Sequence, residues 1–365
     1  MQIIEIINFL ETIAPSSLQE SYDNAGLITG MPEWECTGAM ISLDITDDVI
    51  DEAIKHKANL LIAHHPIVFK GLKRINGKDY VSRNIIRAIK NDLAIYAIHT
   101  NLDNVIEGVN GKIAQMIGLT DCQALAPQAG RLKKLICFVP EAQLPTVRES
   151  IFAAGAGQIG GYSGCSFSVS GTGSFTAGEG TNPIAGAIGQ QHFEQEARLE
   201  VVFPAHIQGK VVSAMIKAHP YEEVAYDIFP MDNHHPGYGS GQTGLLAKPM
   251  EEKAFLEQIR EIFKVPVIRH SALRGRPIKR VSLCGGAGSF LIPNAIANNS
   301  DIFLTADLKY HDFFEASDSM VLADMGHFES EQFTTDLVYG LLKEKFPTFA
   351  VLKTGVNTNP INYFF

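Results

Sequence analysis

Residues that could bind metal ions follow three separate apolar segments of the sequence. His64 and His65 come directly after the apolar run NLLIA and before Pro66. Because successive side chains of a strand point to opposite faces, these two histidines suit two neighbouring ions better than one shared ion. A polar strand end with a single hydrogen-bonded histidine is the alternative explanation of this pair.

Two further groups of polar side chains end apolar segments in the same way. His99 closes the segment LAIYAIHT with an imidazole, and Asp103 follows it with a carboxylate. Asp103 also suits the N-cap of the next helix, where a carboxylate accepts backbone N–H groups. His327 and Glu331 follow the segment MVLAD, and residues four apart lie on one face of a helix. Such a pair also arises by chance or as a surface hydrogen bond.

Together these residues offer the ligand set of a pair of divalent ions. Imidazoles with carboxylates are compatible with zinc, iron, manganese, nickel or cobalt, whereas magnesium and calcium prefer oxygen ligands alone. Two close cations also make a water between them acidic enough to form hydroxide near neutral pH. We therefore expect two divalent ions per chain and hydrolytic chemistry. The expected ligands are His64, His65, Asp103, His327 and Glu331.

The segments that carry these residues alternate between strands and helices. Apolar spacing predicts helices over residues 3–13, 47–56 and 80–92, with strands at TGAMISLDIT, NLLIAHHP and LAIYAIHT. Strands separated by helices of this length indicate a layered α/β sheet with a substantial parallel component. In such sheets, ligands bind beyond the carboxyl ends of the strands, which is where the candidate ligands occur.

The pattern changes between residues 131 and 235. The order of elements there becomes β-α-β-β-α-β, which is typical of a ferredoxin-like α+β domain. After the linker MDNHHPGYGSG the earlier alternation returns. We therefore expect an inserted domain at 131–235 that splits a layered α/β domain formed by residues 1–130 and 236–365. Two domains also fit the length of 365 residues, since domains usually span about 100 to 200.

Composition excludes several classes of protein. Thirty basic and forty acidic residues give a net charge of −10, which argues against binding to a nucleic-acid backbone. The five cysteines are scattered, so they indicate neither a disulfide framework nor a thiolate zinc site. No apolar run approaches the roughly 18 residues of a membrane helix, and the N-terminus lacks a basic signal region. We expect a cytoplasmic protein that binds small molecules or other proteins and does not bind a membrane.

Four other motifs have simpler explanations than catalysis. Residues 285–289, GGAGS, form either an anion-binding loop or a tight turn from strand to helix. GTGSFTAGEG in the inserted domain is either a ligand loop or a mobile hairpin. HPYEE at 219–223 is expected to pack or to contact another subunit rather than to catalyse. The second His-His-Pro, at 234–236, lies in the linker without converging partners and is interpreted as a domain joint.

Six segments of the layered α/β domain together resemble the Nif-three-like family, whose members are commonly labelled GTP cyclohydrolase 1 type 2 homologues. They are YDNAGLITG, LDIT, IAHHPIVFKGLK, IYAIHTNLD, TADLKYHD and DMGHFESE, in this order. Within the insert, GYSGCSF, GTGSF and HPYEEVAYDI resemble the extra domain of the longer bacterial members, which is similar to PII and CutA proteins. The resemblance therefore covers nearly the whole chain.

The resemblance implies a toroidal homohexamer whose dinuclear metal sites face an interior cavity. In the family pattern His65 and Asp103 hold one ion, His64 and His327 hold the other, and Glu331 contacts both. His99 lies beside the site, either as a catalytic proton shuttle or as a partner that orients a ligand. His311 is a further candidate for the cavity lining.

The family label also implies a reaction, the opening of the guanine ring of GTP by a metal-activated hydroxide. Nothing in the sequence is specific for guanine, and no nucleophile elbow or Walker phosphate loop is present. From the ligand set and the family label together, we expect a dinuclear metal-dependent hydrolase that acts on a purine nucleotide. The alternative is a metal-binding regulatory or sensor assembly, without turnover, that works through its PII-like domain.

Overall fold

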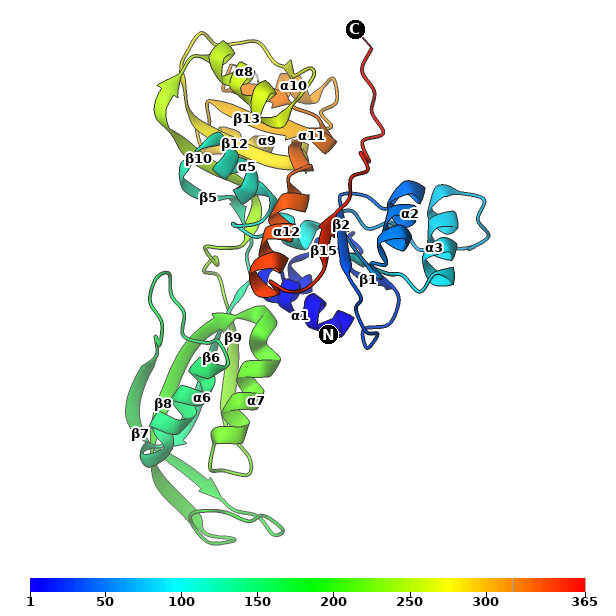
Figure 1. Ribbon diagram of the computed structural model, residues 1–365. Helices are drawn as coiled ribbons and strands as arrows, with labels where there is room; N and C mark the ends of the chain where they lie inside the picture. Colours follow the sequence, from blue (N-terminus) through cyan, green and yellow to red (C-terminus); the bar gives the residue numbers. More distant parts are fainter. Residues whose placement is uncertain (317, 365) are drawn as a thin grey trace. The chain divides into compact units, whose positions relative to one another are not determined.

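A computed structural model describes residues 1–316 and 318–364 of the chain (Figure 1). It divides into two compact units. Unit 1 comprises Met1–Ala126 and Gly237–Phe365, and unit 2 comprises Pro127–Pro236. The boundaries expected from the sequence, at residues 130/131 and 235/236, lie close to these positions. All candidate metal ligands belong to unit 1.

The first sheet of unit 1 has five strands in the order β1-β4-β3-β2-β15. Strand β1 is antiparallel to β4, and the other neighbours are parallel. Every residue of the three central strands is buried, as expected for parallel strands covered on both faces. The strands are β1 (Gly26–Thr29), β2 (Ala39–Ser42), β3 (Leu60–Ala63), β4 (Ala94–Ala97) and β15 (Val351–Lys353).

Helices cover both faces of this sheet. Two of them pack on Met40, Leu61 and Ile95, and each begins with a side-chain cap. Thr46 accepts from the N–H of Val49, and Asp79 accepts from the N–H of Ser82 at 2.7 Å. These two helices are α2 (Asp47–His56) and α3 (Tyr80–Lys90); α1 (Ile3–Ile13) and α12 (Thr334–Lys345) contribute to the core on the opposite face.

The second sheet of unit 1 has the order β11-β14-β13-β12-β10-β5. Its strands β12, β13 and β14 are parallel, whereas β10 and β11 run antiparallel to their neighbours β12 and β14. The strands are β5 (Thr120–Pro127), β10 (Gly239–Met250), β11 (Arg269–His270), β12 (Ile278–Ala287), β13 (Ile302–Ala306) and β14 (Val321–Asp324); the accompanying helices are α4 (Thr100–Asp103), α5 (Val109–Ile117), α8 (Glu252–Phe263), α9 (Ile292–Ala297), α10 (Asp312–Glu315) and α11 (His327–Glu331).

One hydrophobic core joins the two sheets of unit 1. It contains Ile62 and Tyr96 from the first sheet, Val281 and Leu304 from the second, and Val338 from α12. All five side chains are at most 1% exposed. A close-packed core resists relative movement of the parts that it joins, so groups carried by different sheets can keep a fixed geometry.

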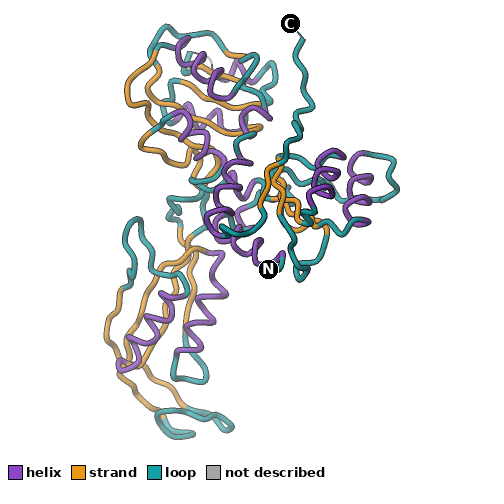
Figure 2. The backbone as a smooth tube through the Cα atoms, in the orientation of Figure 1, coloured by secondary structure: helices purple, strands orange, loops and turns teal. Residues whose placement is uncertain are grey.

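Unit 2 is a four-stranded antiparallel sheet in the order β7-β8-β6-β9. Its two helices lie on one face of the sheet (Figure 2). In the core between them and the strands, Val147 and Met215 cluster with Leu135 and Val201. The elements are β6 (Leu132–Pro140), α6 (Leu144–Ala153), β7 (Phe167–Thr176), β8 (Gln191–Pro204), α7 (Gln208–Ala218) and β9 (Tyr226–Met231). This β-α-β-β-α-β order is that of the ferredoxin-like motif.

The mixed α/β class expected from the sequence is confirmed. Near the C-terminus, helix α11 ends at Glu331 and a separate helix, α12, begins at Thr334. Among the described residues, no helix is both long and apolar enough to cross a membrane.

The carboxyl ends of the parallel strands are level within each sheet. In the first sheet Ser42 pairs with Ala63, and Ala63 pairs with Ala97. In the second sheet Thr305 pairs with Asp324. The residues that follow these strands therefore emerge together at one edge of each sheet, and they include all the candidate ligands.

Candidate metal centre

His64 is held in one tautomer by the backbone of the neighbouring strand segment. Its Nδ1 atom donates to the carbonyl oxygen of Ile98 at 2.9 Å, because a carbonyl can only accept. The Nε2 atom therefore carries the lone pair. This buried atom has no hydrogen-bond partner among the described residues, and the whole residue is 2% exposed.

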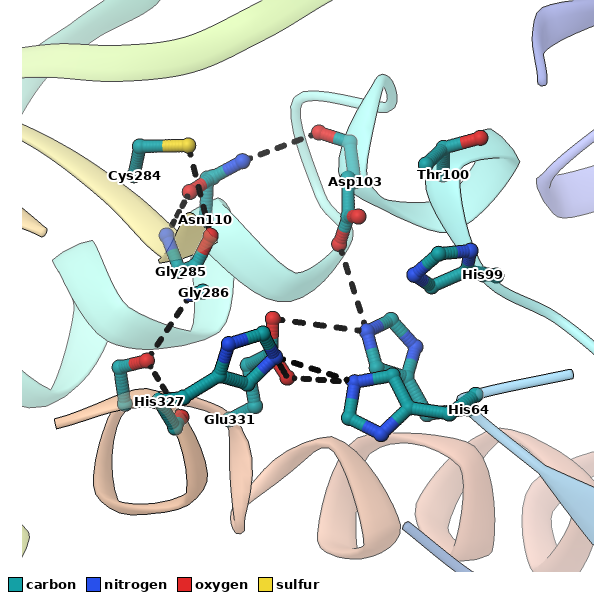
Figure 3. A network of polar contacts seen from close by, with 12 residues as sticks. His64, His99, Thr100, Asp103, Asn110, Cys284, Gly285, Gly286, His327 and Glu331 are labelled. Atoms are coloured by element: carbon teal, nitrogen blue, oxygen red, sulfur yellow. Dashed lines mark hydrogen bonds and ion pairs between the residues drawn. The ribbon is translucent and has the colours of Figure 1, made fainter. Parts of the chain in front are cut away.

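The unpartnered Nε2 of His64 faces two carboxylates. It lies 3.6 Å from Oδ1 of Asp103 and 3.8 Å from Oε1 of Glu331 (Figure 3). The Oδ1 atom of Asp103 is also buried without a hydrogen-bond partner in the described part of the chain. Burial and the Glu331 carboxylate raise the pKa of Asp103. A cation bound between these groups would interact favourably with the His64 lone pair and with both carboxylates.

His65 is held on both sides of its ring. Nδ1 lies 2.8 Å from Oδ1 of Asp44, and Nε2 lies 2.9 Å from Oε2 of Glu331. Burial disfavours the charged imidazole, but the hydrogen bonds to Asp44 and Glu331 outweigh burial and raise the pKa of His65 to about 10. Without metal, His65 is therefore the proton-bearing cation between two carboxylates.

His327 and Glu331 meet across one turn of α11. Nε2 of His327 lies 3.1 Å from Oε2 of Glu331 and 3.3 Å from Nε2 of His65. On its other side, Nδ1 lies 2.7 Å from Oδ2 of Asp307. Burial opposes the charged ring, yet Glu331 and Asp307 raise the pKa of His327 to about 11. The hydrogen bond to His327 in turn lowers the pKa of Asp307.

Glu331 lies between the two halves of the cluster. The residue is 3% exposed, and its two carboxylate oxygens face different histidines. Burial alone would favour the neutral acid, but the neighbouring histidines hold its pKa well below the usual range. An ionised carboxylate with oxygens directed to two sides is suited to bridge two cations.

The pattern that the resemblance implies joins His65 with Asp103 and His64 with His327. In the structure, Nε2 of His64 lies 3.6 Å from Oδ1 of Asp103, whereas Nε2 of His65 lies 2.9 Å from Oε2 of Glu331 and 3.3 Å from Nε2 of His327. The ligand atoms of His65, His327 and Glu331 all lie within 4.8 Å of one another, and so do those of His64, His65 and His99.

His99 is fixed beside the cluster by a buried carboxylate. Its Nδ1 atom lies 2.8 Å from Oδ1 of Asp23, whose side chain is fully buried. Asp23 also accepts from the backbone N–H of Thr100 at 3.1 Å and from its hydroxyl group. Burial opposes ionisation, but these bonds lower the pKa of Asp23 to about 2. The dyad leaves Nε2 of His99 as the ring nitrogen available to the cavity.

The glycine-rich turn after β12 makes room for Glu331. A Cβ on Gly286 would overlap Oε1 of Glu331, and the residue has a φ of 61°. The Gly285 N–H donates to Asn110 at 2.9 Å, and the Gly286 N–H donates to Ser330 at 3.0 Å. These two amides are therefore engaged within the protein, which favours the tight-turn interpretation over an anion-binding loop.

A cavity of about 390 Å³ opens onto the cluster. Tyr22, Phe69 and Phe290 contribute aromatic rings to its lining, and all three residues are substantially exposed. None of the described residues that line it is a lysine or an arginine. His65, His99, Asp103, His327 and Glu331 all line this cavity, but His311 does not.

Three residues near the cluster were missed by the sequence analysis, although each lies in a segment quoted for the resemblance. Asp44 in LDIT orients His65, Asp23 in YDNAGLITG orients His99, and Asp307 in TADLKYHD orients His327. Asp307 directly follows β13 and Asp44 comes two residues after β2, whereas Asp23 lies three residues before β1. A search for carboxylates at all strand ends could have found Asp44 and Asp307.

The fold and this cluster define a class of protein: an α/β unit of two sheets with a histidine–carboxylate cluster at its strand ends, interrupted by a ferredoxin-like unit. The model of the Duf34/NIF3 (NGG1p interacting factor 3) family matches residues 1–360. The chain therefore belongs to the Duf34/NIF3 family.

Similar proteins match over nearly the whole chain. A protein of Halalkalibacterium halodurans named GTP cyclohydrolase 1 type 2 homolog is 38% identical over 363 residues, covering 98% of both chains. A Bacillus subtilis protein of the same name is 35% identical over 367 residues, again covering 98% of both. The crystal structure of a Bacillus cereus protein related to NIF3 superposes with a TM-score of 0.88 at 35% identity, covering 100% of this chain and 99% of that one.

Proposed function

We propose that this protein is a dinuclear metal-dependent hydrolase. The observation that carries the proposal is the pair of unpartnered buried atoms, His64 Nε2 and Asp103 Oδ1, that face each other 3.6 Å apart. A buried lone pair and a buried carboxylate oxygen without donors are costly unless a cation or a proton lies between them. The donor set suits a divalent transition metal.

The proposed ligands form two groups around Glu331. His64, Asp103 and Oε1 of Glu331 would hold one ion, and His65, His327 and Oε2 of Glu331 would hold the other. Zinc, iron, manganese, nickel and cobalt all suit these ligands. When bound, such a pair of ions supplies Lewis acidity and makes water acidic enough to lose a proton near neutral pH.

The residues around the ligands have separate roles in this proposal. Asp44, Asp307 and the carbonyl of Ile98 fix the rings of the ligand histidines, as outer hydrogen-bond partners of metal ligands generally do. His99, oriented by Asp23, accepts or returns a proton at its Nε2 atom during the reaction. Burial of the ligands strengthens every electrostatic interaction at the centre.

The proposed substrate class is a purine nucleotide or a related planar heterocycle. Similar proteins, including those of Halalkalibacterium halodurans and Bacillus subtilis, carry the name GTP cyclohydrolase 1 type 2 homolog, which points to ring opening of a guanine nucleotide. Tyr22, Phe69 and Phe290 offer faces on which a flat base can stack. None of the described residues in the lining is a lysine or an arginine that could bind the phosphates, so their charge would be met at the metal centre.

A turnover assay tests this proposal directly. The metal-loaded protein is incubated with GTP, other nucleotides and a panel of cyclic amides and phosphoesters, next to a His99→Gln variant with the same metal content. Turnover in the wild-type protein that falls at least tenfold in the variant supports hydrolysis. No turnover with any compound contradicts hydrolysis, and equal rates in both proteins contradict the role of His99.

A second candidate function is a metal-binding regulatory assembly without turnover. The ferredoxin-like order of unit 2 favours it, because PII and CutA-like domains share that order and the insert carries none of the proposed metal ligands. In this case the metal-loaded protein turns over no compound of the panel and keeps its metal. A ligand that binds unit 2 then changes the metal affinity or the oligomeric state of the protein. The family resemblance also leads us to propose a homohexamer, which light scattering of the purified protein tests.

A further inference from the structure

We propose that unit 2 contains a binding pocket for a small organic cation, separate from the metal centre and independent of the proposed hydrolase function. Two motifs that the proposed function leaves unexplained, GTGSFTAGEG and HPYEE, line one cavity of about 310 Å³ in this unit. The occupant is a primary ammonium or guanidinium group on an aromatic or aliphatic body.

Glu196 provides the central charge of this pocket. The residue is on β8 and only 9% exposed, and its Oε1 atom accepts from the hydroxyl of Tyr221 at 3.0 Å. None of the described residues that line the cavity is a lysine or an arginine. A buried carboxylate whose hydrogen bond within the described residues comes from a neutral hydroxyl would gain from a cationic ligand bound beside it.

The neighbouring strand is built to admit this carboxylate. Gly173 on β7 lies under Glu196, and a Cβ there would lie 2.7 Å from its Cδ atom and overlap its Oε2 atom. The glycine has no turn to make, since it lies within a regular antiparallel pair opposite Glu194. Because Gly173 has no side chain, it leaves room for the carboxylate of Glu196.

The HPYEE segment forms the second wall. Nε2 of His219 donates to the carbonyl of Phe138 at 2.9 Å, while its Nδ1 accepts from the N–H of Tyr221 at 3.1 Å. These bonds fix His219 as a neutral ring, consistent with the burial that lowers its pKa. They also fix Tyr221, whose ring lies 5.1 Å from that of His219 and 6.1 Å from that of Phe175.

The loop after β7 closes the pocket from a third side. The N–H of Asn182 donates to Oε1 of Glu222 at 2.9 Å, which joins the loop to the HPYEE segment. Glu222 and Glu223 add two further carboxylates to the lining, and Phe138 and Phe175 add aromatic rings. Carboxylates with aromatic faces recognise ammonium and guanidinium groups through charge-assisted hydrogen bonds and cation–π contacts.

A bare metal ion fits this pocket less well than an organic cation. Among the described residues, the only groups of three ligand side chains with their atoms within 4.8 Å of one another lie in unit 1. The carboxylates of unit 2 are therefore spread along the wall of the pocket. This arrangement suits a ligand with a charged end and an apolar body.

Calorimetric titration of the full chain with phenethylammonium tests the proposal, with 3-phenylpropionate as an anion of similar size. We expect saturable binding of the cation alone, weakened about tenfold or more in Glu196→Gln, which keeps the shape and the Tyr221 hydrogen bond. Gly173→Ala, which pushes against the carboxylate, should weaken binding as well. Glu200→Gln is the matched control, since Glu200 lies on the same strand but already pairs with Lys134 and Arg198.

Four results would overturn the proposal. They are failure of the folded wild-type protein to bind the cation, equal binding of the anion, an equal loss of affinity in Glu200→Gln, and unchanged affinity in both pocket variants. The titration is repeated with His64→Ala to separate the two sites. Binding that survives this change supports the pocket in unit 2, whereas binding that disappears places the amine at the metal centre and contradicts the proposal.

Discussion

The Nε2 atom of His64 and the Oδ1 atom of Asp103 face each other at 3.6 Å, and neither has a hydrogen-bond partner in the described part of the chain. His64 cannot reverse its tautomer without losing the bond to the Ile98 carbonyl. His64 directly follows β3, and Asp103 ends the short helix α4, which follows the neighbouring strand β4. The backbone therefore holds the two atoms at a separation that suits a cation bound between them.

Glu331→Gln should lose at least one metal ion per chain while the fold is retained. The amide has no charge to balance two cations, and only one of its two polar atoms can act as a ligand. Elemental analysis of the purified variant measures the loss. Glu329→Gln is the control, because Glu329 lies on the same helix and is also buried, but it accepts from Asn359 and Tyr363 instead. Full metal content in Glu331→Gln contradicts a bridging role.

Asp44→Asn should weaken metal binding about 10- to 100-fold without abolishing it, the range typical of partners that orient a ligand histidine. Asp44 accepts from His65 and also from the Thr358 hydroxyl at 2.9 Å. Competition with a chromophoric chelator gives the affinity. Thr358→Val removes only the second bond and should have a smaller effect. An Asp44→Asn protein with wild-type affinity would show that His65 needs no such partner.

Metal affinity should increase with pH and binding should release protons. In the metal-free protein the pKa is about 10 for His65 and about 11 for His327, so both rings carry protons at neutral pH. A metal ion needs neutral imidazoles and must displace these protons. Calorimetry in buffers of different ionisation enthalpy counts the protons released. Proton-independent binding between pH 6 and 9 contradicts the assignment of these histidines as ligands.

The same two shifts predict how the metal-free protein responds to pH. Because both folded-state pKa values lie above the ordinary value of 6.5, the protonated rings stabilise the fold below that pH. This stabilisation should decline as the pH rises from about 6.5 toward 10. Thermal denaturation of chelator-treated protein measures it. A midpoint that rises over this range would contradict the shifts.

His99→Gln should leave both metals bound and reduce turnover, because His99 is proposed to move a proton rather than to bind an ion. Asp23→Asn should have the same direction of effect, since Asp23 orients the ring through Nδ1. Parallel metal analysis and rate measurements separate the two roles. Loss of a metal ion in His99→Gln would make His99 a ligand, in keeping with its place near His64 and His65.

Removal of residues 127–236 should leave the metal centre intact. All proposed ligands lie in unit 1, and the ends to be joined belong to neighbouring strands β5 and β10. A Cβ on Gly241 would lie 3.5 Å from that of Leu125, so the two ends are close enough for a short turn. Metal analysis and circular dichroism test the shortened chain. A folded product without metal would show that unit 2 shapes the centre.

The sequence could indicate the candidate ligands because they are tied to regular elements. His64 and His65 follow an apolar run, and His327 and Glu331 are spaced for one face of a helix, so local pattern marks them as candidates. Asp44, Asp23 and Asp307 could not be assigned in this way. Their roles depend on which strands are neighbours and on the level of the strand ends, and these are properties of the sheet rather than of any segment.

The pocket of unit 2 could not be predicted from the sequence either. Glu196, Tyr221 and Gly173 are far apart in the chain, and the pairing of β7 with β8 brings Gly173 under the carboxylate. Alternation along β8 suggests only that Glu196 faces one side of the sheet. The antiparallel register and the fold of the HPYEE segment determine that this side is a cavity.

Anomalous diffraction from crystals of the metal-loaded protein tests the central claim most directly. We expect two peaks per chain about 3 to 4 Å apart, as in other two-metal sites. One should lie within bonding distance of His64 and Asp103, the other within bonding distance of His65 and His327, and Glu331 should contact both. A single peak outside this cluster, or no peak in protein loaded with zinc or manganese while His64 and Asp103 keep their positions, would contradict the dinuclear centre.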